Sequence, residues 1–116
     1  MQRMVSDGSR PDALDGLLQE VRRGGIVLAV LGALGREEYG WSLRKELAER
    51  GLEIEEGTLY PLLRRLEDQR LLSSRWRVED GRRRRYYRIT EQGQRVRTRL
   101  ASEWRDMNEV MEGLSG

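Results

Sequence analysis

The hydrophobic positions of this chain follow a helical period in its first half, alternate in the middle and return to a helical period at the end. The first stripe consists of Leu14, Leu17, Leu18 and Val21, at the i, i+3, i+4 and i+7 positions of an amphipathic helix. We expect a helix over residues 12–23, with Asp12 as its N-cap and Gly24 and Gly25 as its end. The almost wholly apolar residues 26–34 are then expected at the centre of a small core.

A second, shorter helix is expected after the acidic turn at residues 36–38. Tyr39 and Trp41 stand at its start, where aromatic side chains usually pack into the adjoining core. The side chains expected to face inward are those of Leu43, Leu47 and Ala48. Gly51 is placed to end this helix in a left-handed conformation, which glycine adopts without steric cost.

The third helix has a regular apolar stripe, and its other side is polar and basic. Its inward-facing residues are Leu59, Leu62, Leu63 and Leu66, again at i, i+3, i+4 and i+7. It begins at Thr58 if that hydroxyl caps the first turn, which places Pro61 where its missing N–H costs little. It begins at Glu55 or Glu56 if Pro61 lies deeper and bends the helix. Two short helices joined by a brief connection form the helix-turn-helix arrangement, whose second helix enters DNA.

A change to a period of two indicates a β-hairpin after the third helix. Residues 72–78 alternate between a partly apolar face and a face that contains arginine, which predicts a strand. Asp80 and Gly81 form a strong hairpin-turn sequence, and residues 83–89 are the expected return strand. The tip carries the consecutive residues Arg82, Arg83, Arg84 and Arg85. The predicted fold is therefore mainly α with a small β-hairpin, a winged helix-turn-helix with an N-terminal helix and a long C-terminal helix.

The last helix is expected to begin at Thr90, which can cap it, with Glu91 at the positive end of the helix dipole. Gly93 is expected to permit a close approach of another segment. The apolar residues of this helix are Leu100, Trp104, Met107, Met111 and Leu114, whose spacings of 4, 3, 4 and 3 are typical of a coiled-coil seam.

This seam needs a partner surface, and in so small a chain only the stripe at residues 14–21 is left to cover it. We therefore expect a two-fold homodimer, with an intramolecular core as the alternative. The expected interface consists of Leu14, Leu17, Leu100, Trp104, Met107, Met111 and Leu114. The expected organisation is a mobile N-terminus at residues 1–11, a winged helix-turn-helix domain with its N-terminal helix at residues 12–90, and a dimerisation helix at residues 91–116.

The composition excludes several classes of protein. The 116 residues suffice for one domain. The charged fraction of 36% and the mean hydropathy of -0.77 exclude a membrane protein, and the chain does not start like a signal peptide, so we expect a cytoplasmic location. Without cysteine or histidine, disulfides and the usual zinc and copper sites cannot form, and we expect neither a metal nor a cofactor.

The charge of the chain is unevenly distributed. Residues 64–99 contain thirteen arginines and five acidic residues, which leaves +8, whereas the remaining nine basic and fifteen acidic residues leave −6. Phosphate contacts supply most of the non-specific affinity for nucleic acid, so this asymmetry fits a polyanion-binding surface. The expected DNA contacts from the polar side of the third helix are Arg64 and Arg65, and those of the wing are the four arginines of its tip. The alternative is that the hairpin is charged only to prevent pairing with other sheets.

Several ordered motifs resemble the PadR family of winged-helix transcriptional regulators, in particular its short members with a single C-terminal dimerisation helix. The resemblance spans residues 25–114. It is carried by Tyr39-Gly40-Trp41, by residues 57–67 (GTLYPLLRRLE), by the basic residues 81–85 and by residues 86–93 (YYRITEQG). Many members have Ser-Pro where this chain has Glu55 and Glu56, next to the start of the third helix.

The resemblance implies a homodimer that binds a palindromic operator in double-stranded DNA, usually as a repressor, and releases it when an effector or a stress signal arrives. It also implies that Thr58 and Tyr60 lie where family members contact the groove and the phosphates, and that the wing arginines lie on the flanking backbone. Multidrug-sensing relatives carry a tryptophan at the position of Trp104 and bind flat aromatic compounds between its two copies.

A planar aromatic small molecule is therefore a candidate effector. The side chains expected around it are those of Leu18, Val21, Arg22, Trp104, Met107, Asn108 and Met111. An ordinary dimer core around Trp104 is the alternative.

Two other classes of function are alternatives to a DNA-binding regulator. A winged helix can instead be an interaction module that contacts protein or RNA. An enzyme is not expected, because the chain has no histidine or cysteine, no phosphate-binding glycine loop and no pair of acids that the spacing brings together. The single lysine, Lys45, is expected on a solvated helix face.

Overall fold

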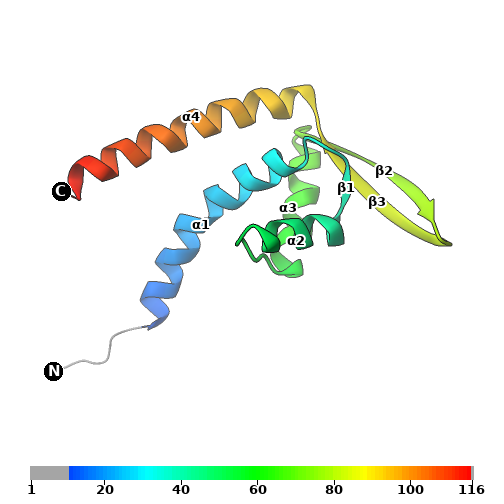
Figure 1. Cartoon of the computed structure of the whole chain (residues 1–116), viewed down its shortest axis with the longest axis horizontal. Coiled ribbons are helices and arrows are strands. Elements are labelled where there is room, and N and C mark those ends of the chain that lie inside the picture. The colour runs from blue at the N-terminus through cyan, green and yellow to red at the C-terminus, as the bar shows by residue number, and fades with distance from the viewer. Residues whose placement is uncertain (1–10, 116) are drawn as a thin grey trace.

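The computed structural model describes residues 11–115, which form four helices and a small antiparallel sheet whose hairpin projects to one side (Figure 1). The elements are α1 (Pro11–Ala33), β1 (Glu38–Tyr39), α2 (Gly40–Glu49), α3 (Glu56–Asp68), β2 (Leu72–Glu79), β3 (Arg82–Ile89) and α4 (Glu91–Leu114). This is the predicted winged helix-turn-helix with an N-terminal and a long C-terminal helix. The expected mobile N-terminus lies outside the described residues, except for Pro11, which begins α1. Within the described part, no helix is long and apolar enough to span a membrane.

α1 is one continuous helix of 23 residues, so the expected break at Gly24 and Gly25 is wrong. Glycine inside a helix costs about 1 kcal/mol relative to alanine, but it does not end the helix. Here the missing side chains make room for the indole of Trp104: a Cβ built at Gly25 would lie 3.4 Å from its Cη2 atom. The expected N-cap, Asp12, also lies inside the helix instead of before it.

The core lies between the C-terminal half of α1, the helices α2 and α3, and the base of the sheet. Its fully buried side chains are Val30, Leu31, Leu34, Leu43, Leu59, Leu63, Leu66 and Leu72. Leu43 and Leu47 of α2 are buried as predicted, but Ala48 is exposed. The expected packing of Trp41 into the core is wrong, because its side chain is exposed and its ring stacks on Tyr39, with 6.3 Å between ring centroids.

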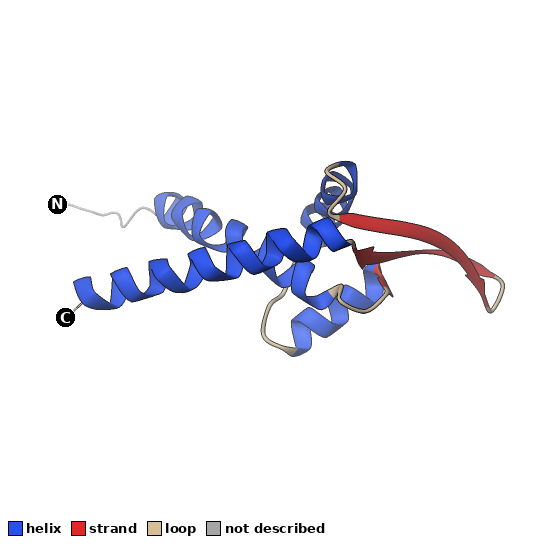
Figure 2. Ribbon diagram, turned by 90° about the horizontal axis from the view of Figure 1, so that it is seen from above, coloured by secondary structure: helices blue, strands red, loops and turns tan. Residues whose placement is uncertain are grey.

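The sheet has the strand order β1-β3-β2, with β1 as a third strand that the alternation pattern does not reveal. β1 has only two residues and pairs with Tyr86 and Tyr87 of β3. β2 and β3 form the predicted hairpin, and Asp80 and Gly81 both have positive φ angles, 51° and 77°, as in a type I′ turn. The hairpin, which we call the wing, projects away from the helices (Figures 1 and 2).

α4 begins where the wing ends and returns alongside α1. The Oγ1 atom of Thr90 accepts a hydrogen bond of 2.9 Å from the backbone N–H of Gly93, which confirms the predicted cap. Gly93 is buried, and a Cβ there would overlap the backbone oxygen of Leu71, which confirms the predicted close approach. Beyond the contact with Trp104, the N-terminal half of α1 and the C-terminal half of α4 diverge (Figure 1).

Candidate nucleic-acid interface

α3 begins at Glu56, so the structure selects the earlier of the two expected starts. Glu55 is the N-cap through its backbone, and its oxygen accepts hydrogen bonds from the N–H groups of Thr58, at 3.0 Å, and Leu59, at 2.9 Å. Thr58 is therefore not the cap. Pro61 lies inside the helix, where it removes one backbone donor. The hydroxyl of Thr58 is consequently available at the surface.

Arg64 lies on the side of α3 opposite the apolar stripe. The four leucines of the predicted stripe, Leu59, Leu62, Leu63 and Leu66, are all buried. Gly57, Pro61 and Asp68 are exposed on the same side as Arg64, in agreement with their helical spacing. The outermost surface of α3 therefore presents small or apolar groups next to one guanidinium and one carboxylate.

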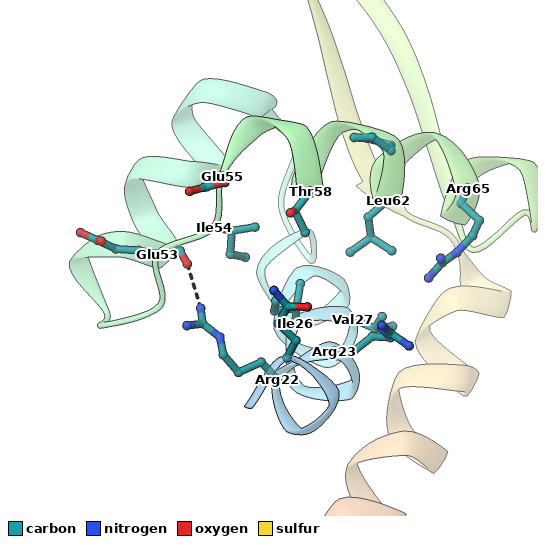
Figure 3. A pocket seen from close by; sticks show the side chains of 12 residues that line it. Arg22, Arg23, Ile26, Val27, Glu53, Ile54, Glu55, Thr58, Leu62 and Arg65 are labelled. Atoms are coloured by element: carbon teal, nitrogen blue, oxygen red, sulfur yellow. Dashed lines mark hydrogen bonds between the residues drawn. The ribbon is translucent and has the colours of Figure 1, made fainter. Parts of the chain in front are cut away.

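Thr58 and Arg65 lie on a different flank of α3, which faces α1. They line a groove with a volume of about 670 Å³, together with Arg22 and Arg23 of α1 (Figure 3). Nη2 of Arg22 donates a hydrogen bond of 2.9 Å to the backbone oxygen of Glu53, which holds it beside the start of α3. Acidic side chains of the connection before α3 line the end of the groove farthest from Arg65. Three arginines thus line this groove, two from α1 and one from α3.

Tyr60 occupies the other flank of α3 and is partly buried. Its ring packs against the first residue of α2: a Cβ built at Gly40 would overlap Cε1 of the ring. The aromatic body of Tyr60 therefore fixes α3 to α2, because only a glycine leaves room for it. This packing role is additional to the contact with DNA that the family resemblance implies.

The outer face of the wing carries arginines whose charges are neutralised within the chain. Both carboxylate oxygens of Glu37 accept hydrogen bonds from Arg75, at 2.7 and 3.0 Å, and one also accepts from Arg77, at 2.9 Å. The Arg75 hydrogen bonds hold the pKa of Glu37 below its usual value. Glu79 accepts hydrogen bonds from Arg77, Arg84 and the hydroxyl of Tyr86. The Tyr86 hydrogen bond is the main cause of the lowered pKa of Glu79.

The inner face of the wing, which faces α3, is joined to that helix by a closed set of hydrogen bonds. Oε2 of Glu67 accepts from the hydroxyl of Ser74 at 2.6 Å, and Oε1 accepts from Arg85 at 3.0 Å. Nε of Arg85 donates to the same Ser74 hydroxyl at 2.9 Å. Tyr87 is buried at this junction, and burial raises the pKa of its hydroxyl. The wing is thereby held at a defined position relative to α3.

These contacts change the interpretation of the four arginines at the wing tip. Four adjacent guanidinium groups repel one another, but Glu79 and Glu67 relieve this repulsion for Arg84 and Arg85 within the chain. Arg82 and Arg83 are exposed and form no ion pair with any residue of the described part. Apart from the exposed Arg88 at the base of the wing, the described charges of the wing without an ion pair therefore lie at its tip.

A pair of carboxyl groups lies behind the sheet, where β1 meets α2. Burial raises the pKa of Glu38 to about 7, and a hydrogen bond with Glu46 adds to the effect. The same hydrogen bond lowers the pKa of Glu46. Oε2 of Glu38 is buried without a hydrogen-bond donor, so a proton held between the two carboxyl groups gives it a partner. Sequence spacing did not indicate this pair.

Comparison with known proteins establishes the family. The sequence model of the PadR-like transcriptional regulators matches residues 27–99. The chain belongs to the PadR-like family. The transcriptional regulator Rv3488 of Mycobacterium tuberculosis is 39% identical over 100 residues, which span 85% of this chain and 91% of that protein.

Solved structures agree with this membership. A PadR family transcriptional regulator from Eggerthella lenta has 40% identity and a TM-score of 0.82, over 90% of this chain and 93% of that one. A PadR-like transcription factor from Bacteroides fragilis has 31% identity and a TM-score of 0.72, over 85% and 98% of the two chains. The predicted resemblance and the function class, a DNA-binding regulator of transcription, are confirmed, and the family consists of transcriptional regulators, not of enzymes.

In this PadR-like regulator the two expected dimerisation stripes do not cover each other. The exposed apolar side chains of the diverging helices are Leu14, Leu17, Leu18, Val21, Met107, Val110, Met111 and Leu114. Leu100 is partly buried against the core. The intramolecular core considered as an alternative is therefore limited to the region where α1 and α4 meet.

The expected effector residues are only partly brought together within one chain. Trp104 lies over Gly24 and Gly25 of α1. Arg22 instead points toward α3 and lines the groove there (Figure 3). Within one chain, Arg22 therefore lies apart from Trp104, although both were expected to surround the same effector.

Sequence reasoning missed the acidic residues that organise the wing, Glu37, Glu67 and Glu79. Glu67 and Glu79 lie close in sequence to the arginine-rich strands, whereas Glu37 is 38 residues from Arg75, and the pairing of all three depends on which face of the hairpin each arginine occupies. The alternation of residues 82–89 assigns those faces, so combining it with the positions of nearby acids could have indicated one of these ion pairs, Glu79 with Arg84.

Proposed function

We propose that this PadR-like regulator binds an operator in duplex DNA as a homodimer, with α3 in the major groove and the wing on the flanking backbone. One observation carries the proposal: exposed arginines without an acidic partner in the described part of the chain occur both on α3, as Arg64 and Arg65, and at the wing tip, as Arg82 and Arg83. Such arginines neutralise phosphates at no cost in broken ion pairs. Thr58 and Tyr60 complete the proposed contacts of α3.

A double variant, Arg82→Ala with Arg83→Ala, tests the contact of the wing with DNA. Each phosphate contact contributes about −0.9 to the slope of log affinity against log salt, so the slope should become shallower by about 1.8. Titration of a labelled duplex at several salt concentrations measures it. The matched control is Arg95→Ala with Arg99→Ala, which removes the same charge from exposed ion pairs on α4. An unchanged slope in the wing variant would reject the contact.

Dimerisation through α1 and α4 is supported by the apolar side chains that their divergence exposes. We propose that residues 91–116 form the dimerisation helix and that Leu14, Leu17, Leu100, Trp104, Met107, Met111 and Leu114 form the interface. A two-fold dimer should select a palindromic site from random DNA, with half-site centres about one helical turn, roughly 34–36 Å, apart. Enrichment of single, unrepeated half-sites would contradict it.

Repression and release by a planar aromatic effector complete the proposal. Two copies of Trp104 near a two-fold axis, with Leu18, Val21, Met107, Asn108 and Met111 around them, would offer flat apolar surfaces to such a compound. Titration of the Trp41→Phe, Trp76→Phe variant with a planar cationic dye reports on Trp104 alone. Quenching that saturates, together with loss of operator binding, is the expected result, and unaltered emission would refute this effector.

A further inference from the structure

Trp76 is an exposed aromatic residue to which the proposed function assigns no role. It lies in the middle of β2, and 53% of its surface is exposed, although tryptophan is one of the most apolar side chains of the chain. Val78, two residues nearer the tip on the same face, is exposed as well. A contiguous apolar surface on a projecting hairpin indicates a contact with another molecule.

Two guanidinium groups lie over the indole of Trp76. The Cζ atom of Arg83 is 4.6 Å from the ring centroid, and that of Arg85 is 5.6 Å away. Arg85 is the direct cross-strand partner of Trp76. Cation–π contacts of this kind limit the conformations of an arginine without neutralising its charge. Arg83 therefore keeps a free charge while its side chain is held beside the indole.

This surface of the wing faces α3. Side chains alternate along the strands, so Trp76 shares a face with Ser74 on β2 and with Arg85 on β3. Both of these residues form hydrogen bonds with Glu67 of α3. The indole thus lies on the side of the wing that continues the exposed surface of α3, whereas on the opposite side Arg75, Arg77 and Arg84 are paired with Glu37 and Glu79.

We propose that Trp76 is the apolar contact of the wing with duplex DNA, packing its free indole surface and Val78 against the deoxyribose rings of the strand beside the groove that α3 occupies. Arg83, held by the indole, then reaches the adjacent phosphate. Deoxyribose is the apolar part of the DNA backbone, and minor-groove binders use apolar side chains together with arginine in this manner. This inference rests on the proposed function and assigns one further residue to it.

The fluorescence of a chain with Trp76 as its only tryptophan tests the contact directly. A Trp41→Phe, Trp104→Phe variant retains it, and the matched control, Trp41→Phe with Trp76→Phe, retains Trp104 on α4. A random-sequence duplex of thirty base pairs is added while the anisotropy of a label on the DNA reports binding. We expect the Trp76 emission to be quenched in parallel with binding, and more strongly than that of Trp104. Unchanged Trp76 emission at saturation would overturn the inference.

Affinity measurements in the otherwise unaltered chain provide a second test that leaves Trp104 in place. Trp76→Ala should weaken binding of the same duplex about tenfold, because it removes the apolar contact. The salt slope should become shallower by at most about 0.9, the share of the one phosphate contact that Arg83 makes. Trp76→Phe should stay within about twofold, because a phenyl ring retains most of the apolar surface. Unaltered affinity of Trp76→Ala would overturn the inference.

The two proposals fail in distinguishable ways. If the unaltered chain binds no duplex at any salt concentration, the proposed function fails. If the unaltered chain binds and Trp76 neither reports nor affects binding, the proposed function stands and only the role of Trp76 is rejected.

Discussion

At the scale of single residues, three glycines of this chain differ in which atoms surround the position that a Cβ would take. The position of a Cβ at Gly93 is occupied by the backbone oxygen of Leu71, which is fixed by the end of α3 and cannot yield. At Gly40 it is occupied by the ring of Tyr60, which can rotate. At Gly16 no atom lies within 4 Å. The same substitution should therefore have three different effects.

Gly93→Ala should destabilise the chain by about 3 kcal/mol, the upper range for overpacking against an unyielding neighbour. Thermal or urea unfolding followed by circular dichroism measures the change. Gly16→Ala is the matched control and should be neutral or stabilise by up to about 1 kcal/mol, because alanine favours an exposed helix. Equal stability of the two variants would contradict the close contact at Gly93.

Glu38 should make the stability of the chain depend on pH near neutrality. Its pKa of about 7 exceeds the unfolded value of 4.5, so the native state holds this proton more tightly. The resulting stabilisation is complete below pH 4.5 and is lost as the pH rises from 4.5 to 7. Since the carboxyl is only partly removed from water, we expect a loss of about 1 kcal/mol.

Glu38→Gln should remove this part of the pH dependence, because an amide does not titrate. The free energy of unfolding, measured by urea titration from pH 4.5 to pH 8, should then be flatter than in the unaltered chain. Glu49→Gln, an exposed change on the neighbouring helix α2, should leave the profile as it was. A Glu38→Gln profile that coincides with that of the unaltered chain would show that the pair holds no such proton.

At the scale of elements, the wing is fixed to α3 by one carboxylate. Glu67 accepts hydrogen bonds from Ser74 and Arg85, and all three side chains are only partly exposed. Two hydrogen bonds at such a junction orient a hairpin that otherwise makes few contacts with the helices. The position of the wing therefore depends on a residue of α3, the helix that we propose enters the major groove.

Glu67→Gln should destabilise the chain by about 1 kcal/mol, after allowance for the solvent exposure of the ion pair. It should also increase hydrogen exchange of the amides at the base of β2 and β3. Glu103→Gln removes an exposed carboxylate from an ion pair in the middle of α4 and should change neither quantity measurably. Unchanged exchange in Glu67→Gln would mean that backbone packing alone holds the wing.

The elements that sequence patterns predicted correctly are those determined by local periodicity. The leucine stripe of α3, the turn at Asp80 and the cap at Thr90 each depend on residues within one or two turns of chain. The errors have non-local causes. β1 exists only because β3 provides a partner, and α1 continues through Gly24 and Gly25, where Trp104, far away in sequence, packs on the helix. The ion pairs of the wing likewise depend on the fold.

At the scale of the whole molecule, the chain is extended, with principal dimensions of 60 × 32 × 25 Å. Much of this length comes from the diverging halves of α1 and α4 (Figure 1). Their exposed apolar faces are the surfaces that the second copy of the proposed dimer would cover.

Leu17→Glu should therefore weaken self-association at least tenfold, since it places a charge in the proposed interface. Sedimentation equilibrium over a range of concentrations measures the dissociation constant. Gln19→Glu adds the same charge to α1 on the side facing α3 and should leave association unchanged. A Leu17→Glu chain that associates as tightly as the unaltered one would place the interface elsewhere.

The small separation between α1 and Trp104 has a consequence for how such regulators can diverge. An alanine at Gly25 would just touch the indole, and any larger side chain would push α4 outward. In a two-fold assembly built on these helices, that displacement would occur in both subunits and alter the distance between the two copies of α3. The number of base pairs between operator half-sites would then depend, in part, on the absence of a side chain at Gly25 of α1.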